Sequence, residues 1–328
     1  MGTKNHILVT GATGFVGLEV AKQLSKQGRY PTLLVRRPLR AALLTSLNAK
    51  VLQGDLDSAD SLRRSCEGVD TVIHLGARAI FEEYDLVKPT IVDGSVRLME
   101  AAIEAGAKRF IYASSMLVYD SQTKPIDQDT PTHPRCGYGE AKVESERILK
   151  KMAREAGIKL GVIRLPHVYG ARDLMFGDVR KGRVFYPGNG RNIFAHMHIY
   201  DAARVLITAA EKGWEGTSVV ADYEPVNWID YLQEIKKYYP RFKTYSVPEW
   251  LALGFTWLIY PIRRLSSDPS VYTPGSVISW NLNLPVKRGI LWDELGIEPK
   301  YPSIYEGIPE VLDSCVPFQW VHSIQDRI

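Results

Sequence analysis

The sequence has few cysteines, little net charge and no clustered metal ligands. Its three cysteines, Cys66, Cys136 and Cys315, are too few and too far apart for a disulfide framework, which is typical of a reducing compartment. The formal charge of +4 comes from scattered basic residues, which argues against nucleic-acid binding. His196 and His198 are two residues apart, and we expect one buried and one exposed on a strand. We therefore expect a cytoplasmic protein with no metal and no nucleic-acid partner.

The sequence also shows no pattern that predicts a membrane span or a signal peptide. Its most apolar segment, residues 250–260, is about half the ~20 residues that a spanning helix needs. Pro261, Arg263 and Arg264 follow it. We expect a buried helix or a helix that lines a substrate pocket, with contact to a membrane interface as the alternative.

Short apolar strands alternate with helical patterns through the first half of the chain. The expected strands are residues 7–10, 32–35, 51–53, 71–75, 110–114 and 160–165, and the expected helices are 16–27, 58–66, 91–105 and 138–156. Such alternation indicates a parallel sheet covered on both faces. Beyond residue 165 glycine, proline and aromatic residues become frequent and the alternation is lost.

These patterns predict an α/β fold with a Rossmann-type doubly wound parallel sheet. The dinucleotide-binding domain is expected at residues 1–165, and residues 200–221 are expected to return to it. Residues 166–199 and 222–328 are expected to form a smaller C-terminal cap that binds the substrate.

The segment from Ile7 to Gly17 reads as a strand, a tight glycine turn and the start of a helix. Gly11 can take the positive φ of such a turn, Gly14 lets the backbone approach a pyrophosphate, and Gly17 lets the helix pack on the strand. The amides and dipole of a helix N-terminus favour phosphate. The pattern predicts a dinucleotide site.

Tyr138 and Lys142 are four residues apart on an expected helix and therefore share one face. An ammonium near a phenol lowers the pKa of the phenol, which can then exchange protons near neutral pH. An ordinary surface pair is the alternative. Ser114 and Ser115, at the end of an expected strand, offer a hydroxyl for a substrate oxygen.

Six motifs share an order and a spacing. They are TGATGFVG at 10–17, GDL at 54–56, HLGA at 74–77, ASSMLVY at 113–119, YGEAK at 138–142 and RLPHVYG at 164–170. Together they resemble the extended short-chain dehydrogenase/reductase family, within the NAD-dependent epimerase/dehydratase superfamily. In character they are closest to the 3β-hydroxysteroid dehydrogenase and dihydroflavonol reductase branches.

The resemblance implies roles for particular residues. Tyr138 would be the general acid/base, Lys142 would bind the nicotinamide ribose, and Ser115 would hydrogen-bond the reacting oxygen. The cofactor-binding set would comprise Gly11, Thr13, Gly14, Phe15, Val16, Gly17, Arg36, Arg37, Asp55, Leu56, Leu75, Gly76, Ala77, Ser114, Tyr138, Lys142, Pro166 and Val168. Helices 91–105 and 138–156 would pair in a homodimer. Ile91 stands where family members often carry the asparagine of a proton relay.

The end of the second expected strand indicates the cofactor. NAD enzymes commonly place Asp or Glu there, against the ribose 2′-hydroxyl. This chain has Arg36 and Arg37, and guanidinium groups bind a 2′-phosphate. We expect NADP, with NAD possible and a solvated basic loop as the alternative.

Three function classes remain open from the sequence. An enzyme that interconverts a ketone and a secondary alcohol on a mostly apolar small molecule is favoured, because Phe194 stands where sugar-nucleotide enzymes usually carry a phosphate-binding arginine. Arg191 could replace that arginine. The expected cap is also rich in aromatic residues, namely Trp250, Phe255, Trp257, Tyr260 and Tyr272. The alternatives are a nucleotide-sugar epimerase or dehydratase and a non-catalytic dinucleotide sensor.

Overall fold

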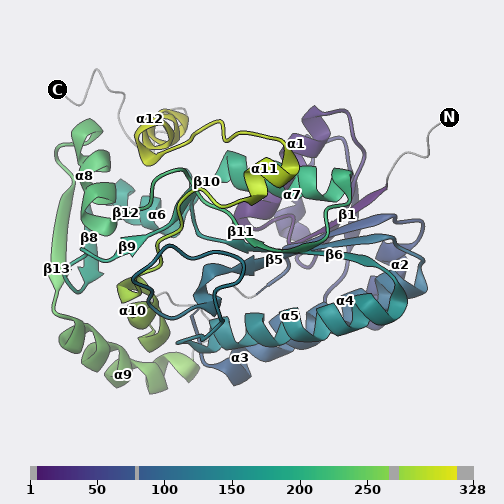
Figure 1. The fold of residues 1–328 in the computed structure, drawn as a ribbon, viewed down its shortest axis with the longest axis horizontal. Helices are drawn as coiled ribbons and strands as arrows, with labels where there is room; N and C mark the ends of the chain where they lie inside the picture. The colour runs from purple at the N-terminus through teal and green to yellow at the C-terminus, as the bar shows by residue number, and fades with distance from the viewer. Residues whose placement is uncertain (1–5, 78–80, 266–272, 316–328) are drawn as a thin grey trace.

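The computed structural model describes residues 6–77, 81–265 and 273–315, and its centre is a seven-stranded parallel sheet (Figure 1). The strand order is β11-β6-β5-β4-β1-β2-β3, with every neighbouring pair parallel. The strands are β1 (Ile7–Thr10), β2 (Thr32–Val35), β3 (Lys50–Gln53), β4 (Thr71–His74), β5 (Arg109–Ser115), β6 (Lys159–Leu165) and β11 (Gly216–Val219). The predicted doubly wound sheet is confirmed.

Helices cover both faces of the sheet. On one face lie α1 (Phe15–Lys26), α7 (Ile199–Lys212) and α11 (Leu291–Leu295); on the other lie α2 (Ala59–Cys66), α4 (Gly94–Glu104) and α5 (Gly137–Ala156) (Figure 1). The short helix α3 (Tyr84–Lys88) lies beside α5. Because both faces are covered, β1, β2 and β4 are buried along their whole length, as their apolar sequences require.

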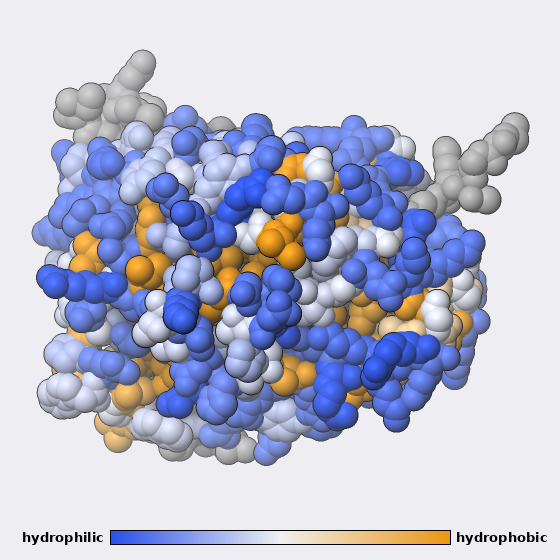
Figure 2. Space-filling view, in the orientation of Figure 1, coloured by the Kyte–Doolittle hydropathy of each residue, from blue (hydrophilic) through white to orange (hydrophobic). Residues whose placement is uncertain are grey.

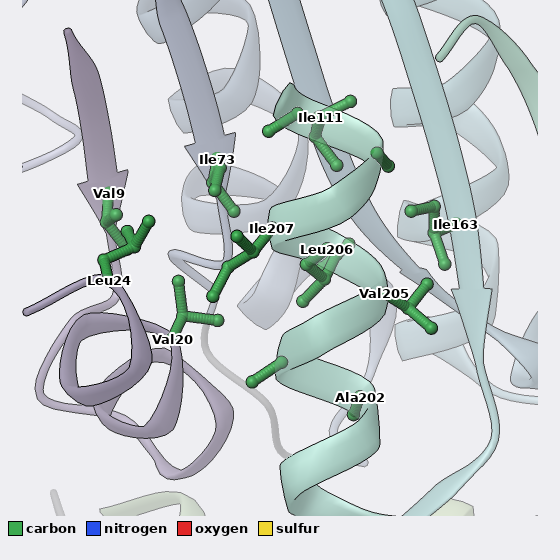
Figure 3. Close-up of a cluster of buried hydrophobic side chains, with 14 of the residues drawn as sticks. Val9, Val20, Leu24, Ile73, Ile111, Ile163, Ala202, Val205, Leu206 and Ile207 are labelled. Carbon is green, nitrogen blue, oxygen red and sulfur yellow. The ribbon is translucent and has the colours of Figure 1, made fainter. Parts of the chain in front are cut away.

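The core under α1 and α7 shows how the first and last parts of the Rossmann unit are joined. Val20 and Leu24 of α1 meet Val9 of β1, while Leu206 and Ile207 of α7 pack over the middle strands (Figure 3). All five side chains are fully or almost fully buried. Residues near 205 therefore belong to the same core as the N-terminal strand.

The remaining elements form the cap beyond the carboxyl ends of the strands (Figure 1). Its strands are β7 (His167–Tyr169), β8 (Arg183–Pro187), β9 (Ile193–Phe194), β10 (His196–His198), β12 (Val226–Asn227) and β13 (Lys243–Val247). Its helices are α6 (Leu174–Arg180), α8 (Trp228–Tyr238), α9 (Glu249–Leu265), α10 (Pro274–Asn281) and α12 (Ile304–Cys315). The strands pair two by two, β10 with β7, β12 with β9 and β13 with β8.

Three expectations on local structure need correction. The helix expected from residue 91 begins with a π-helical turn, Pro89–Asp93, before α4. In that turn the carbonyl oxygen of Ile91 accepts hydrogen bonds from the hydroxyls of Ser95 and Ser145. His196 and His198 are both buried, because β10 pairs with β7 inside the cap rather than at a surface.

The third correction concerns α9, which was expected to be buried or to line a pocket. Trp250, Phe255 and Trp257 are 74, 56 and 58% exposed. The helix packs only its inner face, against α10. Among the described residues no helix is long and apolar enough to cross a bilayer. Tyr272 lies outside the described residues.

Candidate active site

The glycine turn between β1 and α1 depends on close backbone contacts. Gly11 has φ +73°, and a Cβ at this position would lie 2.8 Å from the carbonyl carbon of Leu75. A Cβ on Gly17 would overlap the carbonyl oxygen of Gly11, so the helix could not pack this closely with any larger residue. Gly14 donates its amide to Gly11 (2.8 Å) and begins the helix without a capping side chain. The free amides of this turn fit a pyrophosphate.

Tyr138 and Lys142 lie on the first turns of α5, facing the end of β5. The N-terminal end of α5 is held close to the chain after β5, because a Cβ on Gly139 would overlap the carbonyl oxygen of Leu117. Ser115 caps the 3₁₀ turn after β5, its Oγ accepting the amide of Leu117 (3.2 Å). The same side chain hydrogen-bonds Tyr138. The structure therefore brings Ser115, Tyr138 and Lys142 together.

Lys142 is 3% exposed and donates from Nζ to the carbonyl oxygen of Ala113 (2.7 Å). Its Nζ lies 4.5 Å from the ring centre of Tyr112 and 5.8 Å from that of Tyr138. Burial lowers the pKa of Lys142 to about 7, although the nearby charge of Glu146 opposes this change. Lys142 can therefore be charged or neutral at physiological pH.

The pKa of Tyr138 differs from the sequence-based expectation. Burial raises this pKa above its ordinary value, Cys136 adds to the increase, and the hydrogen bond with Ser115 offsets only part of it. The expected lowering by Lys142 is wrong here, because Nζ of Lys142 is directed to the backbone of β5. Tyr138 is therefore a neutral phenol at pH 7 and can donate a proton.

A buried ion pair fixes β5, β6 and α5 relative to one another. Arg164 binds Glu146 with two contacts, Nε to Oε1 at 3.1 Å and an Nη to Oε2 at 2.7 Å. Ser114 donates its hydroxyl to the same carboxylate (2.5 Å), and Arg164 also donates to the hydroxyl of Tyr119. The side chain of Ser114 therefore points to Glu146.

His74 lies beneath the site with both ring nitrogens engaged. Nδ1 is 2.6 Å from Oγ1 of Thr10, and Nε2 is 2.9 Å from Oγ of Ser95. Burial and the charge of Lys142 lower the pKa of His74 to about 3, so the ring is neutral. The same Oγ1 of Thr10 accepts the amide of Gly76 (3.1 Å), which positions the chain after β4.

Comparison with known proteins identifies the family. The family model described as the NAD dependent epimerase/dehydratase family matches residues 7–221. The chain belongs to this family. It is 27% identical to a 3 beta-hydroxysteroid dehydrogenase/Delta 5-->4-isomerase of Mycobacterium tuberculosis, over 95% of this chain and 90% of that protein. It is 30% identical to the UDP-glucose 4-epimerase of Vibrio cholerae, over 50% of this chain, and it spans about half (52%) of that protein's length.

A solved structure with the same fold is MoeE5 in complex with UDP-glucose and NAD. Its TM-score is 0.76 at 22% identity, over 96% of this chain and 99% of that chain. The NAD-dependent epimerase/dehydratase family thus accounts for the fold, and its relatives include both a steroid dehydrogenase and a sugar-nucleotide epimerase.

The other cofactor-binding candidates of this epimerase/dehydratase family member follow the strand ends. Arg36 and Arg37 are exposed after β2, and Nε of Arg36 lies 3.8 Å from a carboxylate oxygen of Asp55. Leu75, Gly76 and Ala77 are half-buried after β4, as are Pro166 and Val168 after β6. Leu56 is buried, and Thr13, Phe15 and Val16, in the glycine turn and the start of α1, are half-buried.

Sequence reasoning assigned no role to a polar cluster around His167. Its Nδ1 is 3.0 Å from Nδ1 of His196, and its Nε2 is 3.4 Å from Oδ2 of Asp173. The ring of Trp228 lies 5.0 Å from that of His167. A single sequence gives no sign of this cluster, because the pairing of β7 with β10 creates it. Among the described residues, no group of three or more potential ligands is placed to hold a metal.

Sequence reasoning also assigned no role to Phe81. Its ring meets that of Tyr138 edge to face, with centroids 5.9 Å apart. The carbonyl oxygen of Phe81 accepts the hydroxyl of Thr273 (2.6 Å), which ties this loop to the start of α10. An apolar ring therefore borders the phenol that would transfer the proton.

Proposed function

We propose that this protein is an NADP(H)-dependent oxidoreductase that interconverts a ketone and a secondary alcohol on a mostly apolar small molecule. The observation that carries the proposal is the contact of Phe81 with Tyr138, beside Ser115 and Lys142. An apolar ring next to the proton donor suits a substrate whose carbonyl is flanked by hydrocarbon.

The residues divide the proton chemistry between them. Tyr138, held neutral, donates its proton to the ketone oxygen, while Ser115 donates a hydrogen bond to the same oxygen. Lys142 binds the cofactor ribose and, in its charged form, stabilises the phenolate that remains. The nicotinamide, when bound, supplies the hydride.

The turn formed by Gly11, Gly14 and Gly17 would hold the pyrophosphate of a dinucleotide at the N-terminus of α1. A Cβ on Gly11 would meet the backbone of Leu75 and a Cβ on Gly17 the carbonyl oxygen of Gly11, so this turn requires glycine at both positions. Arg36 supports NADP because its side chain is 60% exposed at the end of β2, where it can meet a 2′-phosphate. Its Nε lies 3.8 Å from a carboxylate oxygen of Asp55.

Cofactor titration tests this choice. Wild type should bind NADPH more tightly than NADH, and Arg36→Ala should weaken NADPH binding by about ten- to a hundredfold while leaving NADH binding unchanged. Arg64→Ala, an exposed arginine on α2, is the control and should change neither affinity. Equal affinity of the wild type for the two cofactors would contradict the proposal.

A nucleotide-sugar epimerase or dehydratase is the second candidate, because MoeE5, a structure with the same fold, holds UDP-glucose. One feature favours the apolar substrate instead. Phe194 is buried against Trp228, with centroids 5.2 Å apart, so it offers no charge to a diphosphate. Arg191, which could replace an arginine at position 194, is exposed and favours the second candidate. The exposed aromatic residues of α9 no longer support an apolar pocket, so the apolar substrate rests on Phe194 and on the contact of Phe81 with Tyr138.

A substrate screen separates the two candidates. Ketones are incubated with NADPH, secondary alcohols with NADP, and UDP-sugars with either cofactor. The absorbance of NADPH reports oxidation or reduction, and the sugar products are analysed separately. Turnover of an apolar ketone with NADPH consumption supports the proposal. An epimerised UDP-sugar with no net NADPH consumption would replace it with the second candidate.

We also propose a cytoplasmic homodimer formed through α4 and α5. An open groove of about 410 Å³ lies between these helices. It is lined by the apolar residues Val92, Val96 and Ile148 and by the charged residues Lys88, Asp93, Arg97, Glu100 and Glu144. Cys66, Cys136 and Cys315 are buried and none is part of a disulfide within the described residues, which is compatible with a reducing compartment.

A further inference from the structure

The outer face of α9 is apolar where a surface helix is normally polar. Trp250, Leu251, Phe255, Trp257 and Leu258 are 74, 49, 56, 58 and 76% exposed; we call these five residues the α9 patch. Figure 2 shows hydrophobic atoms at the lower left surface, where Figure 1 places α9. Exposed apolar groups gathered on one element commonly mark an interaction surface.

The fold itself uses only the opposite face of α9. Thr256 and Tyr260 are buried, and the helix contacts α10. The helix is therefore apolar on both sides, a pattern that belongs to helices covered all round. Burial within the chain accounts for one side and leaves the α9 patch uncovered.

Two further exposed aromatic rings lie on β13, the strand that precedes α9, and on β8, with which β13 pairs. Phe185 of β8 and Tyr245 of β13 stack with centroids 5.0 Å apart and are 55 and 43% exposed. Since β13 ends at Val247 and α9 begins at Glu249, these rings extend the apolar surface beyond the helix.

The chain around α9 is mainly basic. Residues 236–264 contain six basic residues and one acidic residue, Glu249, and Lys237 is paired with Glu234. Lys236, Arg241 and Lys243 are exposed. Apolar and aromatic side chains next to basic ones are the features with which an interfacial helix binds an anionic bilayer.

We propose that α9 docks this protein on the surface of an anionic lipid bilayer, with the α9 patch inserted among the headgroups. Seventeen residues form a helix about 25 Å long, which suits a helix lying in the plane of the interface. The tryptophans at positions 250 and 257 have the amphipathic rings that favour this region. A symmetric pair of chains joined at α9 would instead bring two basic segments together.

Vesicle flotation tests the proposal with the full chain. Wild type should float with vesicles of phosphatidylcholine and phosphatidylserine, more weakly at high salt, and not with phosphatidylcholine alone. Trp257→Ser/Leu258→Ser should require at least about tenfold more lipid for half-maximal binding. Tyr30→Ser changes a side chain of similar exposure (60%) on the Rossmann unit and should leave binding unchanged.

A variant with one basic residue reversed in charge provides an independent test of membrane binding. Lys243→Glu should weaken binding to phosphatidylserine vesicles by roughly tenfold or more and should reduce its salt dependence. Failure of wild type to float with either vesicle would overturn the proposal, as would unchanged binding of Trp257→Ser/Leu258→Ser. If that double variant instead converted a dimer to a monomer in sedimentation, the occupant of the α9 patch would be a second copy. Flotation does not depend on the proposed ketone chemistry, so either idea can fail alone.

Discussion

Replacing Lys142 by methionine should make the protein without cofactor more stable at pH 6. The ammonium of Lys142 is held in a buried position where its pKa falls from 10.5 to about 7. At ~1.36 kcal/mol per pH unit, this difference corresponds to a cost of about 5 kcal/mol at acidic pH. Methionine has a similar length and carries no charge.

The substitution also removes a favourable contact. Nζ of Lys142 donates to the carbonyl oxygen of Ala113, and an unpaired buried carbonyl costs about 1–3 kcal/mol at any pH. The net gain of Lys142→Met at pH 6 is therefore about 2–4 kcal/mol.

The difference in the free energy of unfolding between the two proteins changes with pH in one direction. Between pH 7 and pH 10.5 the unfolded chain holds a proton on Lys142 that the folded protein has released, because the folded pKa is the lower one. The wild type therefore gains stability, relative to the variant, as pH rises through this window, by about 4 kcal/mol between pH 6 and pH 10. Near pH 10 the variant should no longer be the more stable protein.

Urea denaturation of both proteins at pH 6, 8 and 10 measures the difference directly. Lys151→Met, an exposed position on the same helix, is the control and should stay within about 0.5 kcal/mol of wild type at each pH. A destabilised Lys142→Met at pH 6, or a difference from wild type that does not change with pH, would refute the reasoning.

Three other predictions concern the same elements. Tyr138→Phe should lower turnover by about 10²–10⁴-fold, with cofactor affinity by titration nearly unchanged, since only the proton-donating hydroxyl is lost; full activity would return Tyr138 to a structural role. Arg164→Met should lower the free energy of unfolding by about 3–5 kcal/mol in urea, because it leaves the carboxylate of Glu146 buried without its partner, and a loss below 1 kcal/mol would contradict this. Sedimentation at micromolar concentration should give a dimer that Ile148→Glu on α5 dissociates, whereas a wild-type monomer near 36.9 kDa would count against the proposed interface.

Much of the sheet could be predicted because its signals are local. The strand β1 and the glycines at positions 11, 14 and 17 lie within one short segment, and each glycine is required by the local backbone conformation or by a close backbone contact. The spacing of Tyr138 and Lys142 likewise depends only on the helix repeat.

The features that sequence reasoning missed depend on distant contacts. The His167 cluster exists because β7 pairs with β10, which places His167 beside His196, 29 residues later in the chain. No pattern within either segment reveals that pairing. The pKa of Tyr138 was misjudged for a related reason, since the backbone of β5 attracts the Lys142 ammonium. Apolar composition near residue 255 could not distinguish a buried helix from an exposed one, because only the position of α9 at the edge of the cap decides it.

The cap is interrupted by part of the sheet. The segment from β7 to β10 comes first, and the chain then returns through α7 and β11 to the seven-stranded sheet. The segment from β12 to α10 continues the cap, α11 packs on α7 beside the sheet, and α12 completes the cap. A chimera that exchanges the whole cap with that of another protein therefore needs five junctions rather than one: next to β7, before α7, after β11, before α11 and after α11. No single proteolytic cut can release the cap whole. New substrate specificity in such a chain is more readily reached by substitutions within the separate cap segments than by exchange of a domain.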